Sequence, residues 1–275
     1  MSTAVPSSAA STPWRLPPFM RGSAVLHLGA LAVAVAVPGA WPWALGAVLL
    51  NHVAITAIGL APRSHWLGEN ITRLPAAASA RGEVALTIDD GPEPAVTPAV
   101  LDLLDAAGQK ATFFCIAERV QAHPDLAREI VARGHSIQNH TARHRHNFSV
   151  LGPRGYAAEI SRAQDLLSAA TGQRPSCFRA PAGLRNPFLA PVLHRLGLML
   201  VSWTRRGFDT REGDAATVLA RLTRGLAAGD ILLLHDGNAA RTAAGQPVVL
   251  EVLPLLLAQL KAQGLHSVTL PEALR

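Results

Sequence analysis

Two long runs of apolar residues open the chain. The first covers residues 23–37 and stops at Pro38, and the second covers residues 41–61 with only three polar interruptions. The second run is long enough to cross the roughly 30 Å hydrocarbon core of a bilayer, and the first reaches that length when counted from residue 19. Tryptophans at the turn and beyond the far end are typical of membrane interfaces. We therefore expect residues 19–61 to form two transmembrane helices.

Two other interpretations of these runs stay open. One helix could span the bilayer beside an interfacial partner, or the first run could be a cleaved signal peptide, although no small-residue cleavage site follows it. Arginines flank the pair, with Arg15 and Arg21 before it and Arg63 and Arg73 after it, while the turn carries no charge. The positive-inside rule then puts both ends in the cytoplasm, at a bacterial-type inner membrane. A single crossing would instead make the rest of the chain periplasmic.

From residue 81 onward the pattern changes to short β-rich runs that alternate with helical stretches. The expected strands are 84–88, 111–116, 136–139, 176–178, 198–201, 231–234 and 267–269. The expected helices are 98–107, 124–133, 155–171, 187–196, 215–227 and 249–263. This alternation is typical of a parallel α/β fold, and we expect a distorted seven-stranded (β/α) barrel after the transmembrane hairpin. An open doubly wound sheet is the alternative, but no glycine-rich phosphate loop follows the first strand.

The chain thus divides into four expected parts. A tail rich in Ser, Ala and Pro covers residues 1–18 and is expected to be disordered. The helical hairpin covers residues 19–61, a linker covers residues 62–82, and one α/β domain covers residues 83–275.

Composition narrows the function classes. Charged residues make up 16% of the chain, hydrophobic residues 49%, and the mean hydropathy is +0.22, which excludes a disordered protein and fits partial insertion in lipid. The formal net charge is +6, yet no cluster of Lys and Arg occurs, so we expect no nucleic-acid partner. Cys115 and Cys177 are too few for a disulfide scaffold, and we expect two reduced core thiols.

Unusual polar residues follow three of the expected strands, at the strand ends where barrel enzymes keep their chemistry. Asp89 and Asp90 end the first strand, and adjacent carboxylates repel unless a cation or a proton-transfer task uses them. His140 and His144 follow the third strand, and on a helical turn this i, i+4 spacing presents both imidazoles to one point. His235 ends the sixth strand.

Each of these features is commonly structural when it occurs alone. Together, Asp90, His140 and His144 make a two-histidine, one-carboxylate set that suits a divalent metal. We expect Zn²⁺, with Co²⁺, Mn²⁺ or Ni²⁺ as alternatives.

Five segments, in this order and spacing, resemble the motifs of the polysaccharide deacetylases, which are carbohydrate esterase family four with the NodB-homology domain. They are Thr87–Gly91, His140–His144, Arg179–Gly183, Asp209 and Leu233–His235. The resemblance extends from residue 83 to the C-terminus and implies metal-dependent hydrolysis of an amide on an amino sugar.

The resemblance also implies a role for each residue. Asp89 would be the general base that takes the proton of a metal-activated water, and Arg179 would hold Asp89 ionised and oriented. His235 would be the general acid for the leaving amine, and Asp209 would keep it cationic. The remaining implied roles belong to the backbone N–H of Ala182, which would stabilise the oxyanion, and to Leu233, which would line the acyl pocket.

Two motifs depart from the family pattern. The third motif usually reads Arg-Pro-Pro-Tyr-Gly, but Ala182 stands at the tyrosine, which opens the sugar-binding wall and keeps the N–H. The fourth motif keeps only its second aspartate and lacks its tryptophan, so Phe208 or Trp203 would replace that wall. Four further arginines follow the strand ends and could bind a phosphate or an anionic sugar, or form a solvated rim. They are Arg185, Arg205, Arg206 and Arg211.

The sequence therefore predicts a membrane-bound hydrolase that removes N-acetyl groups from a polysaccharide or a lipid-linked saccharide. A cytoplasmic domain favours the lipid-linked substrate. The alternatives are a periplasm-facing peptidoglycan or exopolysaccharide deacetylase, an inactive glycan-binding pseudoenzyme, and a membrane assembly protein. The complete set of acidic, basic and histidine residues argues against the last two.

Overall fold

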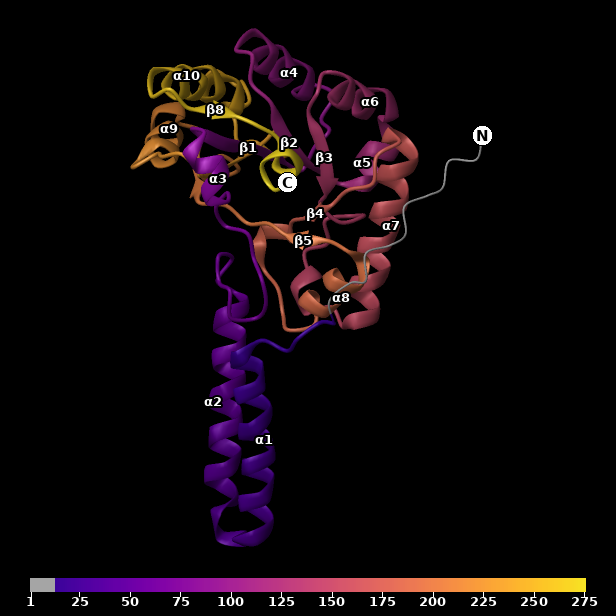
Figure 1. Cartoon of the computed structure of the whole chain (residues 1–275), viewed down its shortest axis with the longest axis vertical. Coiled ribbons are helices and arrows are strands. Elements are labelled where there is room, and N and C mark those ends of the chain that lie inside the picture. The colour runs from indigo at the N-terminus through magenta and orange to yellow at the C-terminus, as the bar shows by residue number, and fades with distance from the viewer. Residues whose placement is uncertain (1–12) are drawn as a thin grey trace.

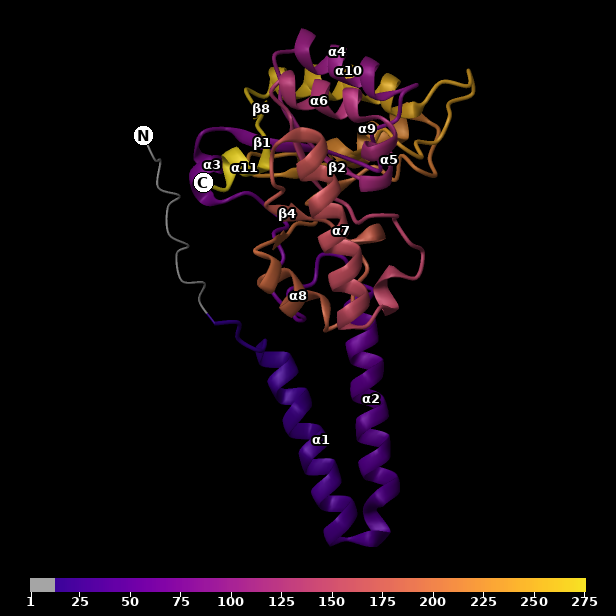
Figure 2. The same ribbon diagram turned by 90° about the vertical axis from the view of Figure 1, so that its right-hand side faces the viewer.

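A two-helix stalk and a rounded domain make up the described part of the chain (Figures 1 and 2). The computed structural model describes residues 13–275, so most of the predicted disordered tail lies outside it. In the stalk, α1 (Pro18–Ala36) and α2 (Trp41–Gly59) are joined by the short 3-10 turn Pro38–Ala40. Prolines in the first turns of both helices fit there, because those N–H groups need no intrahelical partner.

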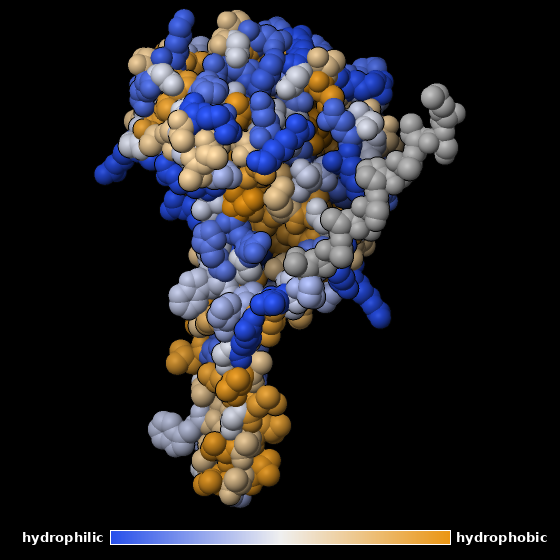
Figure 3. All heavy atoms as spheres, in the orientation of Figure 1, coloured by the Kyte–Doolittle hydropathy of each residue, from blue (hydrophilic) through white to orange (hydrophobic). Residues whose placement is uncertain are grey.

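The face of the stalk seen in Figure 3 is largely apolar, and the stalk projects away from the domain. Val25, Leu28, Leu50 and Val35 are 68–73% exposed. Pro18–Ala36 and Pro38–Gly59 are both long and apolar enough to cross a membrane. Exposure of this kind distinguishes these helices from the buried core helices of a water-soluble protein.

Polar side chains join the two helices of the stalk. Asn51 Nδ2 donates a hydrogen bond of 2.7 Å to Ser23 Oγ. The Nε2 atoms of His27 and His52 lie 3.3 Å apart. These contacts fix the rotation of one helix against the other.

A curled sheet of parallel strands forms the domain, as the sequence predicts. Its strands are β1 (Glu83–Asp89), β2 (Ala111–Cys115), β3 (Ser136–Asn139), β4 (Cys177–Phe178), β5 (Met199–Leu200), β6 (Arg205–Arg206), β7 (Ile231–His235) and β8 (His266–Ser267). Seven of them follow the order β5-β4-β3-β2-β1-β7-β6, and β8 pairs with the start of β1. Within residues 13–275, β5 and β6 are not paired with each other, so the barrel is distorted and open between them.

The strand predictions miss β6, which consists of two arginines and has no apolar alternation. The gap beside β5 is filled by the segment expected to be a linker. Ile71 bridges to Val201, and Arg73 bridges to Asp230 just before β7. Residues 71–73 therefore tie the hairpin directly to the sheet.

Helices lie between the strands, close to the predicted positions. They are α4 (Thr97–Ala106), α6 (Pro124–Ala132), α7 (Pro153–Thr171), α8 (Leu189–Leu196), α9 (Ala215–Thr223) and α10 (Val248–Ala262). Gly172 and Gly197 end α7 and α8 in the left-handed conformation, which glycine adopts without steric cost. Short helices were not predicted, because four to six residues are too few to show a periodicity. They are α3 (Ala76–Ala80), α5 (Ala117–Ala122) and α11 (Leu270–Ala273).

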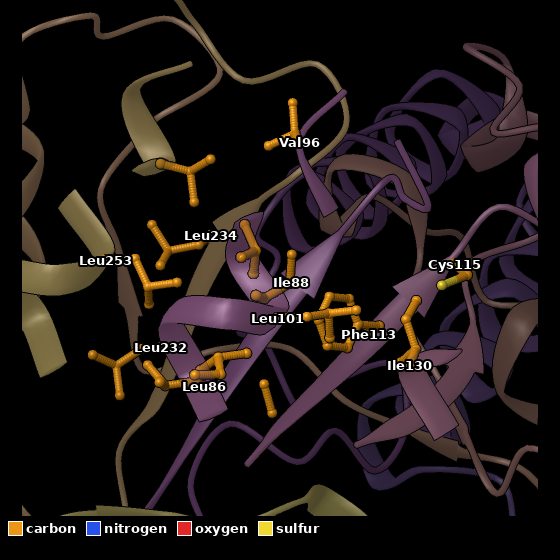
Figure 4. Packing of buried hydrophobic residues seen from close by; sticks show 14 of the residues in the cluster. Leu86, Ile88, Val96, Leu101, Phe113, Cys115, Ile130, Leu232, Leu234 and Leu253 are labelled. Atoms are coloured by element: carbon orange, nitrogen blue, oxygen red, sulfur yellow. The ribbon is translucent and has the colours of Figure 1, made fainter. Parts of the chain in front are cut away.

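The main core lies between the sheet and its outer helices (Figure 4). Leu86 and Ile88 of β1 are fully buried in this core, with Leu101 of α4 and Leu253 of α10. Because side chains alternate along a strand, the intervening residues of β1 point to the inner side of the curled sheet. Both cysteines are buried and free, as expected.

Candidate active site

The strand register brings the predicted acid and base to neighbouring positions. Asp89 is the last residue of β1, His235 is the last residue of β7, and the two are paired across the parallel ladder. Both are buried and point to the inner side of the sheet. The carboxyl end of the sheet therefore holds the reactive groups, as in other barrel enzymes.

Arg179 holds Asp89 in place through an ion pair. Its Nη1 donates to Asp89 Oδ1 at 2.6 Å and to Thr87 Oγ1 at 2.8 Å. The other guanidinium donors reach the carbonyl oxygens of Val201 and Ser202. Burial lowers the pKa of Arg179 and the Asp89 carboxylate opposes that shift, so the buried pair is held as an ion pair.

Asp90 takes part in a different set of contacts from its neighbour. Its φ of 73° lies in the left-handed region, which interrupts the alternation of β1. Asp90 Oδ1 lies 3.3 Å from Nε2 of His140 and 3.3 Å from Nε2 of His144. Asp90 Oδ2 accepts a hydrogen bond from Asn238 Nδ2 at 3.0 Å.

The two histidines converge on a loop, so the predicted helical turn is wrong. Thr141 and His144 have φ values of 69° and 51°, which a right-handed helix does not allow. Thr141 Oγ1 accepts a hydrogen bond from the backbone N–H of His144, which closes the loop. The imidazole rings of His140 and His144 end with their centroids 4.9 Å apart.

The backbone sets the tautomer of His140. Its Nδ1 donates to the carbonyl oxygen of Arg179 at 2.8 Å. A carbonyl oxygen can only accept, so in the neutral ring the proton lies on Nδ1 and the Nε2 lone pair faces Asp90. A histidine whose second nitrogen is fixed in this way is the usual arrangement in metal sites.

The residues fit a divalent cation. One ligand atom from each of Asp90, His140 and His144 lies within 4.8 Å of the others. Asp90 Oδ1 is buried and has no hydrogen-bond partner among the described residues, so an acceptor is left for a cation. One carboxylate and two imidazoles form a donor set that suits Zn²⁺ and neighbouring metals.

The titrations of Asp90 and His144 agree with that fit, whereas His140 must lose a proton before it can coordinate. Burial opposes the charge of Asp90, but the neighbouring His140 holds the pKa of that carboxyl well below its usual range. Burial lowers the pKa of His144 to about 4, so its imidazole is neutral near pH 7 and free to coordinate. Burial also opposes the charge of His140, yet Asp89 and Asp90 raise its pKa.

Asp209 holds His235 at two points. Asp209 Oδ1 accepts from His235 Nδ1 at 2.9 Å, and Oδ2 accepts from the His235 backbone N–H at 2.7 Å. Burial disfavours the imidazolium, but the Asp209 carboxylate outweighs it and raises the pKa of His235 to about 9. His235 is therefore protonated at neutral pH.

The predicted substrate-wall residues divide into two groups. Leu233 and Trp203 are buried in one cluster inside the curled sheet. Ala182 lies in the short turn Pro181–Gly183 after Arg179, with a φ of 53°. Phe208, in contrast, is 47% exposed, and the centroid of its ring lies 4.9 Å from the Arg206 guanidinium.

Several residues near the site were not predicted. Asn238 binds the metal-site aspartate, and Thr87 accepts from the same Arg179 nitrogen as Asp89. Asp236 is buried, and burial raises its pKa to about 6. Asn238 lies in a loop and has a φ of 61°, which lets its side chain reach Asp90. Nothing in the sequence indicates that backbone conformation.

Comparison with known proteins gives consistent matches. The family model described as polysaccharide deacetylase matches residues 77–201. A peptidoglycan-N-acetylglucosamine deacetylase of Bacillus cereus is 33% identical over 199 residues, which are 70% of this chain and 88% of that protein. A chitooligosaccharide deacetylase of Azorhizobium caulinodans is 32% identical over 70% of this chain and 94% of its own length. Among solved structures, a family 4 carbohydrate esterase from Streptomyces lividans in complex with acetate is similar, with 32% identity and a TM-score of 0.61. That match covers 68% of this chain and 91% of the esterase chain.

Proposed function

This chain belongs to the polysaccharide deacetylase family, and we propose that it removes the N-acetyl group from an amino sugar of a saccharide substrate. The carrying observation is the joint presence of three parts in one buried site. These are the Asp90, His140 and His144 ligand set, the Asp89–Arg179 pair and the Asp209–His235 pair. A protein that only binds glycan has no need of a buried base and a buried acid that are each fixed by an ion pair.

The cofactor is a divalent metal, for which we propose Zn²⁺. Asp90, His140 and His144 would hold it. When bound, the metal supplies a Lewis acid that activates water and polarises the amide carbonyl. Cobalt, manganese and nickel accept the same donors.

Asp89 is the proposed general base. Its Oδ1 is occupied by Arg179, while Oδ2 lies 3.9 Å from His140 Nε2, on the side of the metal ligands. Asp89 Oδ2 is thus the atom that takes the proton of the attacking water. Arg179 keeps this carboxylate ionised and prevents its rotation.

His235 is the proposed general acid. With Nδ1 fixed on Asp209, its Nε2 carries the proton that passes to the leaving amine. The water oxygen bonds to the carbonyl carbon, the amide C–N bond then breaks as the nitrogen takes the proton of His235, and acetate and the free amino sugar are the products. The Ala182 N–H would stabilise the oxyanion, and Leu233 and Trp203 would enclose the acyl methyl group, with Phe208 farther out.

We further propose that residues 19–61 anchor the enzyme in the bacterial inner membrane, with the catalytic domain in the cytoplasm and a lipid-linked saccharide as substrate. The exposed apolar surface of the stalk and its flanking arginines support this arrangement. The relatives are named for peptidoglycan and chitooligosaccharide. A periplasmic domain acting on such polymers is therefore the second candidate.

Acetate release by the purified full-length chain in neutral detergent tests the proposal. The substrates would be N-acetylated chitooligosaccharides, peptidoglycan fragments and lipid-linked N-acetylated saccharides. We expect release from at least one class, and we expect Asp89→Asn to lower kcat about 10²- to 10⁴-fold. Asp125→Asn, at an exposed carboxylate of α6, is the matched control and should retain full activity. Activity that survives in Asp89→Asn would contradict the assignment of the base.

A further inference from the structure

A cavity of about 450 Å³ lies between the site and the end of the stalk. Four arginines and two aromatic residues line it, namely Arg63, Arg205, Arg206, Arg221, Trp203 and Phe208. Arginine is the side chain best suited to bind phosphate or carboxylate groups. Four guanidinium groups around one cavity repel one another unless negative charges lie close to them.

Two of the four arginines are already paired. Arg205 Nε donates to Asp230 at 2.6 Å, and its other nitrogens reach the carbonyl oxygens of Arg224 and Gly225. Arg221 lies 3.2 Å from Glu212. These two side chains are held by the protein and shape the cavity.

Neither of the other two forms an ion pair with a carboxylate within residues 13–275, although the charges of Asp209 and Asp89 act on Arg206 from a distance. Arg63 donates a hydrogen bond to the carbonyl oxygen of Thr204 at 3.1 Å. Arg206 has no hydrogen bond and no ion pair within residues 13–275, and its Nε is buried. Its guanidinium lies between two rings, with centroids 5.2 Å away for Trp203 and 4.9 Å away for Phe208. A half-buried cation with unused donors is costly unless an anion binds there.

The lining of the cavity connects it to the catalytic residues on one side and to the stalk on the other. Trp203 lies beneath Arg206 and also 5.9 Å from Arg179, the arginine that holds the base. The other side of the cavity is lined by Pro62 and Arg63, which come shortly after the last residue of α2. The carbonyl oxygen of Pro62 accepts hydrogen bonds from Ser202 and Asn70, so this junction is fixed to the domain.

Arg185 was one of the arginines that could bind an anion, but it does not line this cavity. It is buried, its guanidinium donates to the carbonyl oxygen of Ser64, and its N–H donates to Gly59 at 3.1 Å. Arg185 therefore fastens the stalk to the domain, and the free guanidinium of the cavity is that of Arg206.

We propose that this cavity binds the phosphate group through which the substrate saccharide is attached to a membrane lipid. The inference rests on the proposed deacetylase function and assigns its specificity to Arg206 and Arg63. A phosphate is favoured over a sugar carboxylate because the cavity lies next to the end of α2. In a membrane-anchored chain that end lies at the membrane surface, where the phosphate of a lipid-linked sugar also lies. The sugar would then extend from the phosphate toward Trp203 and the catalytic residues.

Two substrates that differ only in the phosphate test this specificity. N-acetylglucosamine would be linked to an octyl chain either directly or through a phosphodiester, and kcat/KM would be measured with the full-length chain in neutral detergent. We expect the phosphate-linked substrate to be favoured about 10- to 100-fold, the worth of a charge-assisted contact. Arg206→Gln should reduce that preference to near unity, and Arg206→Lys should restore part of it. Arg128→Gln, an exposed arginine of α6, is the matched control.

Binding to the metal-free chain separates this inference from the catalytic proposal. Octyl phosphate should bind the wild-type chain and lose about tenfold or more in affinity in Arg206→Gln. Equal binding by both proteins, equal use of both substrates, or tighter binding of glucuronate would overturn the phosphate site. Inhibition by phosphatidylglycerol that is as strong as inhibition by octyl phosphate would also overturn it, because the cavity would then hold membrane headgroups. If octyl phosphate binds as expected but neither these two substrates nor any of the three saccharide classes tested above releases acetate, the deacetylase proposal fails and the phosphate site stands.

Discussion

Burial and the Asp209 carboxylate act in opposite directions on the His235 imidazole. The imidazole is 7% exposed, which disfavours its charge, yet its pKa lies at about 9. A general acid of this kind works only while protonated. Activity is therefore expected at neutral pH and should fall as the pH rises through about 9.

Asp209→Asn tests this dependence. The amide oxygen can still accept from His235 Nδ1, but the negative charge that raises the pKa is gone. We expect the alkaline limb of kcat/KM to move from about pH 9 toward the unperturbed histidine value of about 6.5. A pH profile between 5.5 and 10 would measure it, and an unchanged alkaline limb would mean that His235 is not the acid.

The same variant has a stability signature. Because the folded-state pKa of His235 is raised, the protonated ring stabilises the fold fully below about pH 6.5, and this contribution is lost as the pH rises through about 9. Urea unfolding of the metal-free wild-type chain should therefore show a loss of stability over that window that Asp209→Asn lacks. Parallel pH dependences for the two chains would contradict the pairing.

At the scale of elements, strands with an apolar pattern were predictable and short polar ones were not. The β1 and β7 predictions fell within one or two residues of the observed bounds, since β-branched and leucine residues fill both strands. Two arginines make up β6, and only pairing with β7 makes them a strand. The order of β7 and β6 beside β1 is a long-range property that local patterns do not encode.

The site was predictable because motif residues follow those strands directly. Asp90, His140 and His144 do converge. The left-handed backbone at Asp90 and His144, the loop in place of a helical turn, and the contact from Asn238 depend on tertiary packing. The burial of His135, whose Nδ1 accepts from the N–H of Ala111, is likewise set by packing and has no local signal in the sequence.

Within the stalk, the Ser23–Asn51 hydrogen bond should couple the two helices. We expect a double-mutant cycle with Ser23→Ala and Asn51→Leu to give a coupling free energy of about 0.6–2 kcal/mol, the range for polar pairs in membranes. Unfolding in mixed micelles of a mild detergent and dodecyl sulfate would measure it. Val25→Ala, at a residue that is 68% exposed, is the control that should not couple with Asn51→Leu. A coupling near zero would mean that the pair does not hold the helices together.

In the molecule as a whole, the end of the stalk is fixed to the domain. Residues 71–73 pair with the sheet and Arg185 binds the end of α2. A saccharide held by a lipid in the same membrane would therefore meet the site at a defined height.

Orientation in the membrane is tested by reporters fused after Arg275. A hairpin with cytoplasmic arginines predicts a fluorescent cytoplasmic reporter and an inactive periplasmic phosphatase. The same fusions to a chain that begins at residue 81 should be soluble. An active phosphatase would place the domain in the periplasm and favour a wall polymer as substrate.

Deacetylation is proposed to depend on the metal that Asp90, His140 and His144 would hold. The most direct test of this dependence is titration of the metal-free full-length chain with Zn²⁺ while acetate release is followed. Release should rise with added metal and level off at one equivalent per chain. His144→Ala should need far more metal, whereas His146→Ala, at an exposed histidine of the same loop, should match the wild type. Full activity without metal, or an unchanged titration in His144→Ala, would contradict the account.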